Sequence, residues 1–358
     1  INPRIIEYPG EDHEHMLLLY YKALNYLKIN DLEGALVECR RLNNRLNELS
    51  DRYKSDRKYR RDAFIHNLMG MIYEAAGDPN NAFIAYRNAY EIYQEDFVEM
   101  FGVQAPEQLK KDLMRAAYLS GFQDDLRSYE ETFGYPYEHT IPAHGEVLLL
   151  WHNGLGPIKD EWSVNFTVVE GEAGFVTFEN ANQGFSFPFP LADYEDDEDD
   201  DFKVTDLEFF RVVFPKYVER VPSTFSASVR ANGKVWDLEE AEDINAIAFK
   251  VLEQRMVWEF SQSLMRAAIK KAAEKSLEGE DEGLGFAVGV INALTEQADT
   301  RNWQTIPHSI HYARIPLQAG DNELTMTVGA EAGVGTGERF YFSGQQGKTY
   351  FHTYQSFY

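Results

Sequence analysis

The chain contains a single cysteine, Cys39, among 358 residues, so no disulfide can form within it. It has no run of 18 apolar residues, and its longest apolar stretch, Leu284–Leu294, is too short for a membrane-spanning helix. Basic residues are few: the chain has 34 Lys and Arg but 59 Asp and Glu, which gives a formal net charge of −25. Nucleic acids and anionic lipids are bound by clustered cations, so the charge argues against both as partners.

Catalytic and metal-binding motifs are also absent. The sequence has no Gly-x-Ser-x-Gly nucleophile elbow, no phosphate-binding Gly-x-x-x-x-Gly-Lys-Ser/Thr loop and no Cys/His cluster, so we expect no cofactor and no structural zinc. His308 and His311 lie in a predicted strand, where an odd offset directs them to opposite faces and disfavours a shared metal.

The acidic run Asp193–Asp201 invites comparison with a calcium-binding EF-hand loop. It fails the comparison, because Glu198 and Val204 stand where that loop needs Gly and Glu. A solvated loop is the simplest interpretation, and the alternatives are weak cation binding and contact with a basic partner.

Apolar residues are plentiful enough for a sizeable core. Hydrophobic residues make up 44% of the chain and aromatic residues 14%, and a length of 358 residues predicts two domains. Residues 12–133 have a helical pattern, in which 63–95 predicts two short amphipathic helices broken at Gly77-Asp78-Pro79. Small residues occur where two helices must approach closely: Gly70, Ala82 and Ala89.

The same spacing occurs earlier in the chain. The steps of +3, +9, +4 and +3 that join Gly70, Tyr73, Ala82, Tyr86 and Ala89 also join Ala23, Tyr26, Ala35, Cys39 and Leu42. A third, weaker helical pair spans 106–133. Three pairs are enough for a stable stack.

The pattern resembles the tetratricopeptide repeat (TPR), a helix–turn–helix unit of about 34 residues. This resemblance implies a stack of helical pairs whose concave groove binds a peptide or protein segment. Since such grooves often hold a peptide by the first helix of each pair, the candidate partner-binding residues are Arg60, Asn67 and Tyr73.

Strand patterns dominate after a Pro- and Gly-containing stretch at 134–145. Val147–Trp151 is continuously apolar, and Asn232-Gly233 between two alternating segments predicts a hairpin. The other predicted strands are Trp162–Val169, Phe175–Phe178, His311–Leu317, Glu323–Val328, Phe340–Phe342 and Thr349–Tyr354. A long helix over Leu238–Ser276 and a shorter one over Phe286–Gln297 are expected to form an inserted helical hairpin.

The expected fold is therefore multidomain, α and α+β. Residues 1–135 form TPR-like helical-hairpin repeats, and 136–358 form a mainly antiparallel β domain with a helical insertion at about 238–297. The segments 148–161 and 298–325 are similar to uncharacterised bacterial exported lipoproteins with a helical-repeat region before a β-rich region. That resemblance implies a cell-envelope location, in the periplasm or as an outer-membrane lipoprotein. Because the chain starts at Ile1 and not at Met, we expect a processed leader, with a possible lipid anchor.

The leading functional hypothesis is a non-enzymatic interaction or scaffold protein that binds a peptide or protein through the repeat groove. The alternative is glycan or small-ligand binding by the β domain, with Trp151, Trp162 and Trp303 as candidate residues. A hydrolase that uses two carboxylates is a third possibility, but the sequence singles out no pair.

Overall fold

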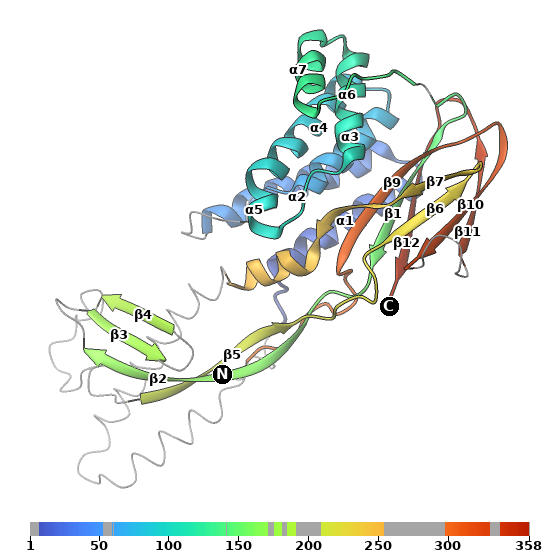
Figure 1. Ribbon diagram of the computed structural model, residues 1–358. Helices are drawn as coiled ribbons and strands as arrows, with labels where there is room; N and C mark the ends of the chain where they lie inside the picture. The colour runs from blue at the N-terminus through green and yellow to red at the C-terminus, as the bar shows by residue number, and fades with distance from the viewer. Residues whose placement is uncertain are drawn as a thin grey trace, which may run out of the picture. The chain divides into compact units, whose positions relative to one another are not determined.

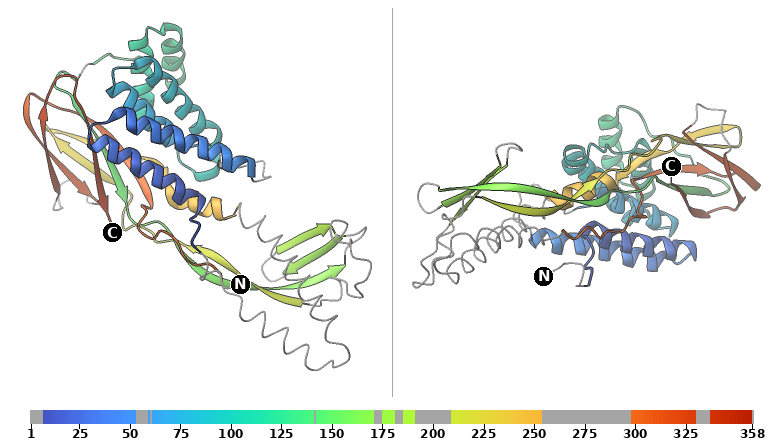
Figure 2. Two further views of the ribbon diagram at one scale, coloured as in Figure 1. Left: turned by 180° about the vertical axis from the view of Figure 1, so that it is seen from behind. Right: turned by 90° about the horizontal axis from the view of Figure 1, so that it is seen from below.

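A computed structural model describes residues 7–52, 59, 61–140, 142–170, 175–180, 185–190, 209–253, 298–329 and 337–357 (Figures 1 and 2). The chain forms two compact units. The larger unit comprises Gly10–Pro157, Glu219–Val251 and Trp303–Tyr358, and the smaller comprises Ile1–Pro9, Ile158–Val218 and Leu252–Asn302. The boundary expected between residues 135 and 136 falls inside the larger unit.

The helices of the larger unit are arranged in hairpin pairs, as predicted. The pairs are α1 (Asp12–Lys28) with α2 (Leu32–Arg52), α3 (Ala63–Ala75) with α4 (Pro79–Ile92), and α6 (Glu107–Ser120) with α7 (Gln123–Phe133). A π-helical turn, η2 (Tyr93–Phe97), and α5 (Val98–Phe101) connect the second pair to the third. The carboxylates of Asp62 and Asp78 cap α3 and α4 by accepting hydrogen bonds from backbone N–H groups in the first turn.

Small residues allow the paired helices to approach closely. Ala82 and Ala89 are completely buried, and a Cβ atom added to Gly70 would lie 2.4 Å from the ring of Tyr86. In the first pair, Ala35 and Cys39 are equally inaccessible. The packing role predicted for these positions is therefore confirmed.

The strands of the larger unit form two four-stranded sheets. The sheet next to the helices, here called the inner sheet, has the order β12-β1-β9-β8, and the outer sheet has the order β11-β10-β6-β7. All neighbours are antiparallel except β1 and β12, which run parallel. The strands are β1 (Glu146–Asn153), β6 (Ala227–Ala231), β7 (Lys234–Asp237), β8 (Glu239–Asp243), β9 (Ser309–Pro316), β10 (Gly320–Val328), β11 (Glu338–Gly344) and β12 (Thr349–Ser356).

The inner sheet is covered on both faces, so the larger unit has three layers (Figure 1). Leu148 and Leu150 of β1 belong to a core shared with the helices, whereas Val147, Leu149 and Trp151 belong to a core shared with the outer sheet. Every residue of β1 is buried as a result. This explains why its sequence is continuously apolar instead of alternating.

The smaller unit contains a separate antiparallel sheet of order β4-β3-β2-β5. Its strands are β2 (Ile158–Glu170), β3 (Phe175–Asn180), β4 (Phe185–Pro190) and β5 (Phe209–Val218), in agreement with the strands predicted at 162–169 and 175–178.

Two local predictions have clear outcomes. The Asn232-Gly233 hairpin is confirmed, with both residues at positive φ (52° and 76°), as a type I′ turn requires. The helix predicted from Leu238 is wrong at its start, because 239–243 pair with β9 as β8. The helix begins only at 244, after Asp243 accepts a hydrogen bond from the N–H of Ala246 as an N-cap.

Other predictions fall on residues that the structure does not describe. The acidic run 193–201 and the part of the predicted helical hairpin between 254 and 297 lie outside the described residues. Within the described part of the chain, no helix is both long enough and apolar enough to cross a membrane.

Candidate functional site: a cleft beside helix α6

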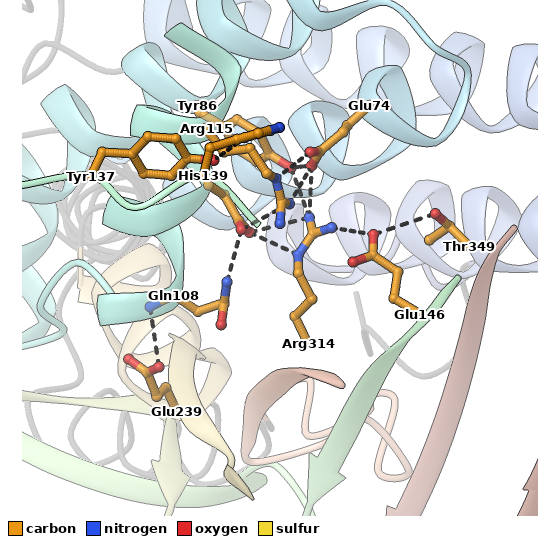
Figure 3. Close-up of polar contacts among 11 residues, drawn as sticks. Glu74, Tyr86, Gln108, Arg115, Tyr137, His139, Glu146, Glu239, Arg314 and Thr349 are labelled. Carbon is orange, nitrogen blue, oxygen red and sulfur yellow. Dashed lines mark hydrogen bonds and ion pairs between the residues drawn. The ribbon is translucent and has the colours of Figure 1, made fainter. Parts of the chain in front are cut away.

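A buried cluster of charged groups connects the helices to the inner sheet (Figure 3). Arg314 of β9 lies on the helix-facing side of the sheet, with 4% of its side chain exposed. Its Nη2 is 2.9 Å from Oε2 of Glu74 on α3, its Nε is 3.2 Å from Oδ2 of Asp112 on α6, and its Nη1 donates to Glu146 of β1. One cation thus joins two helices to two strands.

A second arginine completes the cluster. Arg115 of α6 donates from Nη2 to Oε2 of Glu74 at 2.7 Å and lies 3.0 Å from Oδ1 of Asp112. Burial opposes ionisation of Glu74, but the charges of Arg314 and Arg115 outweigh it and lower the pKa of Glu74 to about 2. Gln108 also donates to Asp112, at 2.8 Å. The cluster therefore holds two cations and three carboxylates in fixed positions.

A cleft of about 560 Å³ opens over this cluster. Its volume is within the range typical of small-molecule pockets. The walls come from α6, the segment after α7, β7 and the end of β9, and the lining residues are Gln108, Lys111, Met114, Arg115, Tyr135, Pro136, Tyr137, Glu138, Thr140, Pro142, Glu146, Lys234, Trp236, Arg314 and Pro316.

The cleft lining is more positive than the chain as a whole. Four lining residues are Lys or Arg and two are Glu, a formal sum of +2, compared with −25 for the chain. Glu74 and Asp112 lie behind the lining and compensate its arginines. The lysines are exposed and make no ion pair with any residue that the structure describes: Lys111 and Lys234.

Aromatic contacts fix the segment that forms one wall. The Tyr137 N–H donates to Oε1 of Glu130 at 2.8 Å, and its hydroxyl hydrogen-bonds Nδ1 of His139 at 3.0 Å. The His139 ring stacks on Tyr118 of α6 with centroids 4.4 Å apart. The wall is thereby anchored to α6 and α7.

The two described residues that were predicted for a repeat groove, Asn67 and Tyr73, do not line this cleft. Asn67 is fully buried on α3, close to the Tyr312 hydroxyl of β9, and is therefore inaccessible to a partner. Tyr73 is half-buried, and its hydroxyl accepts a hydrogen bond from Arg40 at 3.1 Å. Arg60 lies outside the described residues.

The inner sheet occupies the face on which a repeat groove was expected. That face belongs to the first helix of each pair, and all three of these helices contact the inner sheet. Tyr20 of α1, for example, is hydrogen-bonded to His152 of β1 at 2.8 Å, and Asp112 of α6 to Arg314 of β9. The cleft instead lies where α6, β7 and the end of β9 meet.

The three predicted tryptophans do not line this cleft. Trp151 is fully buried, with its Nε1 donating to Oγ of Ser356 at 2.8 Å, and Trp303 donates from Nε1 to Oγ1 of Thr305 at 2.8 Å. Trp162 belongs to β2 of the smaller unit. Trp236 of β7 does line the cleft, but it was not predicted as a site residue. The sequence of a hairpin strand does not reveal that the strand lies beside a distant helix such as α6.

A second buried polar site contains two facing carboxyl groups, Asp62 and Glu242. Asp62 accepts hydrogen bonds from the Tyr59 hydroxyl at 2.7 Å and the Ile65 N–H at 2.8 Å. Burial raises the pKa of Glu242 well above its usual value, and the neighbouring Asp62 raises it further. The adjoining cavity is only about 10 Å³. That volume is near the lower limit for one water molecule, so the pair has no room for a glycan substrate.

His308 and His311, which were considered as a metal-binding pair, are both buried, and each makes a separate hydrogen bond. Nε2 of His308 is 3.0 Å from Oε1 of Glu219, and Nε2 of His311 is 3.0 Å from Oγ of Ser309. Among the described residues, no group of three or more His, Cys, Asp and Glu side chains is arranged to hold a metal ion.

Comparison with known proteins does not assign the chain to a family: no family model, curated protein or solved structure matches it. The cleft and the buried ion cluster beneath it are the features from which a function must be argued.

Proposed function

We propose that this chain is a non-enzymatic interaction protein that binds a peptide or protein segment in the cleft beside α6. The observation that supports this proposal most strongly is the cleft of about 560 Å³. The arginines at its floor are already paired with carboxylates of the protein. A matched floor stays in place without ligand, so a partner would bind a preformed surface and lose little free energy in ordering it.

In this function the helical pairs serve as a scaffold, and the binding surface is the cleft instead of the repeat groove. Residues of the first helices, such as Asn67, are covered by the inner sheet, whereas the cleft walls include exposed residues, such as Thr140. The role of the helices is then to position α6 and the segment after α7. Glycan binding is not part of the proposal, because Trp151 and Trp303 do not line the cleft.

We also propose that the protein acts in the cell envelope as a member of a TPR-like family. The support is the repeat spacing at Gly70 and Ala82, and the likeness of 148–161 and 298–325 to exported lipoproteins.

Selection from a random peptide library on the immobilised protein tests the binding proposal. Thr140→Trp places a large side chain in the cleft from an exposed position, and Thr132→Trp adds the same ring to an exposed position of α7 outside the cleft. Selected peptides should bind the wild type and T132W and lose binding to T140W. Peptides that bind all three proteins equally would overturn the proposal.

A further inference from the structure

The arginines of the cleft floor are not the groups that select a ligand. Arg314 and Arg115 are each held by at least two carboxylates, and the shared acids are Glu74 and Asp112. A ligand that took these arginines would have to displace buried acids, which would then be left uncompensated at a large cost. The floor, formed by Arg115 and Arg314, therefore gives the cleft its shape. The charged groups that can discriminate between ligands are those at the rim: Lys111, Lys234 and Glu138.

Two lysines stand on different walls of the rim. Lys111 belongs to α6 and Lys234 to β7, and both are exposed and without an ion-pair partner in the described part of the chain. One exposed carboxylate, Glu138, also lines the cleft. Lys111, Lys234 and Glu138 thus give the rim a formal charge of +1, which the nearby carboxylate of Glu239 on β8 partly offsets at Lys111.

The rest of the molecule makes this excess selective. With the rim sum of +1 removed, the other residues carry −25 − 1 = −26. An acidic segment is repelled by that surface and attracted at the rim, while a basic segment is attracted to many places. Charge patterns of this kind determine where a partner binds more than how tightly.

The walls of the cleft are rich in rings. They include Tyr137, Trp236, Pro136, Pro142 and Pro316. Flat aromatic and proline surfaces favour a ligand that carries an aromatic or proline ring of its own.

Resting on the proposed function, we infer that the cleft binds an acidic peptide segment whose carboxylates flank an aromatic or proline residue. The carboxylates pair with Lys111 and Lys234 at the rim, and the ring packs against Tyr137 and Trp236.

Fluorescence anisotropy with two defined probes tests the inference on the full chain. The probes are fluorescein-labelled peptides with the cores Glu-Glu-Tyr-Pro-Glu-Glu and Lys-Lys-Tyr-Pro-Lys-Lys. The acidic probe should bind the wild type and lose about tenfold or more in affinity with the double variant K111E/K234E, because both rim attractions become repulsions. Lys28→Glu, an exposed lysine outside the cleft, should leave the affinity nearly unchanged.

The outcomes separate this inference from the proposed function. Library peptides that require an open cleft but are basic or uncharged would overturn the inference and leave the function in place. An acidic probe that binds wild type and K111E/K234E equally would overturn the inference as well. Failure of both probes and of the library selection would remove the function and the inference together.

Discussion

Nη2 of Arg314 lies 2.9 Å from Oε2 of Glu74, and this contact joins β9 to α3 across 240 residues of sequence. Both side chains are largely buried, at 4% and 14% exposure. With Asp112 and Glu146, the pair forms a buried ion cluster that connects α3 and α6 to the inner sheet, in addition to hydrogen bonds such as that between Tyr20 and His152.

Replacement of Arg314 by Met should destabilise the larger unit strongly. The variant leaves three buried carboxylates without their shared cation, and loss of one partner of a buried ion pair costs about 3–5 kcal/mol. Urea unfolding followed by circular dichroism measures the loss. Arg339→Gln removes an exposed arginine 3.6 Å from Glu323 and should change little. Equal midpoints for the two variants would contradict the role assigned to Arg314.

Replacement of Glu242 by Gln should stabilise the protein at alkaline pH. The pKa of Glu242 is raised by burial and by Asp62, so its contribution to stability is fully present below the unfolded-state pKa of about 4.5. That contribution is lost as pH rises through the folded-state pKa. Glutamine stays neutral at every pH, so the stability difference, E242Q minus wild type, should grow with rising pH.

Denaturant unfolding at several pH values between 5 and about 9 measures this difference. Glu33→Gln, at an exposed position of α2, supplies the control and should show a nearly constant difference. A difference for E242Q that stays flat across the range would argue against a proton held between Asp62 and Glu242.

Replacement of Gly70 by Ala should destabilise the second helical pair although alanine is the better helix former. The new Cβ would lie 2.4 Å from the Tyr86 ring, and overpacking of this kind costs about 1–3 kcal/mol, more than the gain of about 1 kcal/mol in propensity. A double-mutant cycle with Tyr86→Leu checks the cause. If G70A costs as much without the tyrosine ring as with it, the contact is not the reason.

Replacement of Tyr20 by Phe should cost about 1–3 kcal/mol, because it removes the hydroxyl that is hydrogen-bonded to Nε2 of buried His152 at 2.8 Å. Burial lowers the pKa of His152 to about 4, so the ring is neutral in the folded protein at pH 7. The stability that the buried neutral His152 contributes should be fully present above about pH 6.5, the unfolded-state pKa. It should be lost as pH falls toward the folded-state pKa of about 4. Thermal unfolding compares Y20F with Tyr341→Phe, an exposed tyrosine that should be neutral to replacement.

Features set by neighbours along the chain were predictable from the sequence. The hairpin at Asn232-Gly233 follows from the backbone freedom of these two residues, and the helical pair around Gly77-Asp78-Pro79 follows from its cap and breaker. The helix predicted at Leu238 failed at its start because pairing with β9 decides the structure of 239–243, and β9 is distant in sequence.

The candidate site was not predictable, since distant segments build it. Its one sequence signal was Arg314, the single Lys, Arg, Asp or Glu of β9, since such a residue in a sheet covered on both faces indicates a buried counter-charge. The pattern did not identify Glu74, Asp112 or Glu146 as that counter-charge. Asn67 was misplaced for a related reason: a polar residue suggests an exposed position on a helix, but β9 covers it.

The position of β9 has a consequence for biosynthesis. The ribosome adds 309 − 133 − 1 = 175 residues between the end of α7 and the start of β9. At about 5–20 residues per second this takes roughly 10–35 s, during which the apolar side of the helical pairs has no cover from that strand. Before β9 is made, contacts between the helices themselves, such as those of α1 with α2 and of α3 with α4, limit the exposure of this apolar side to aggregation.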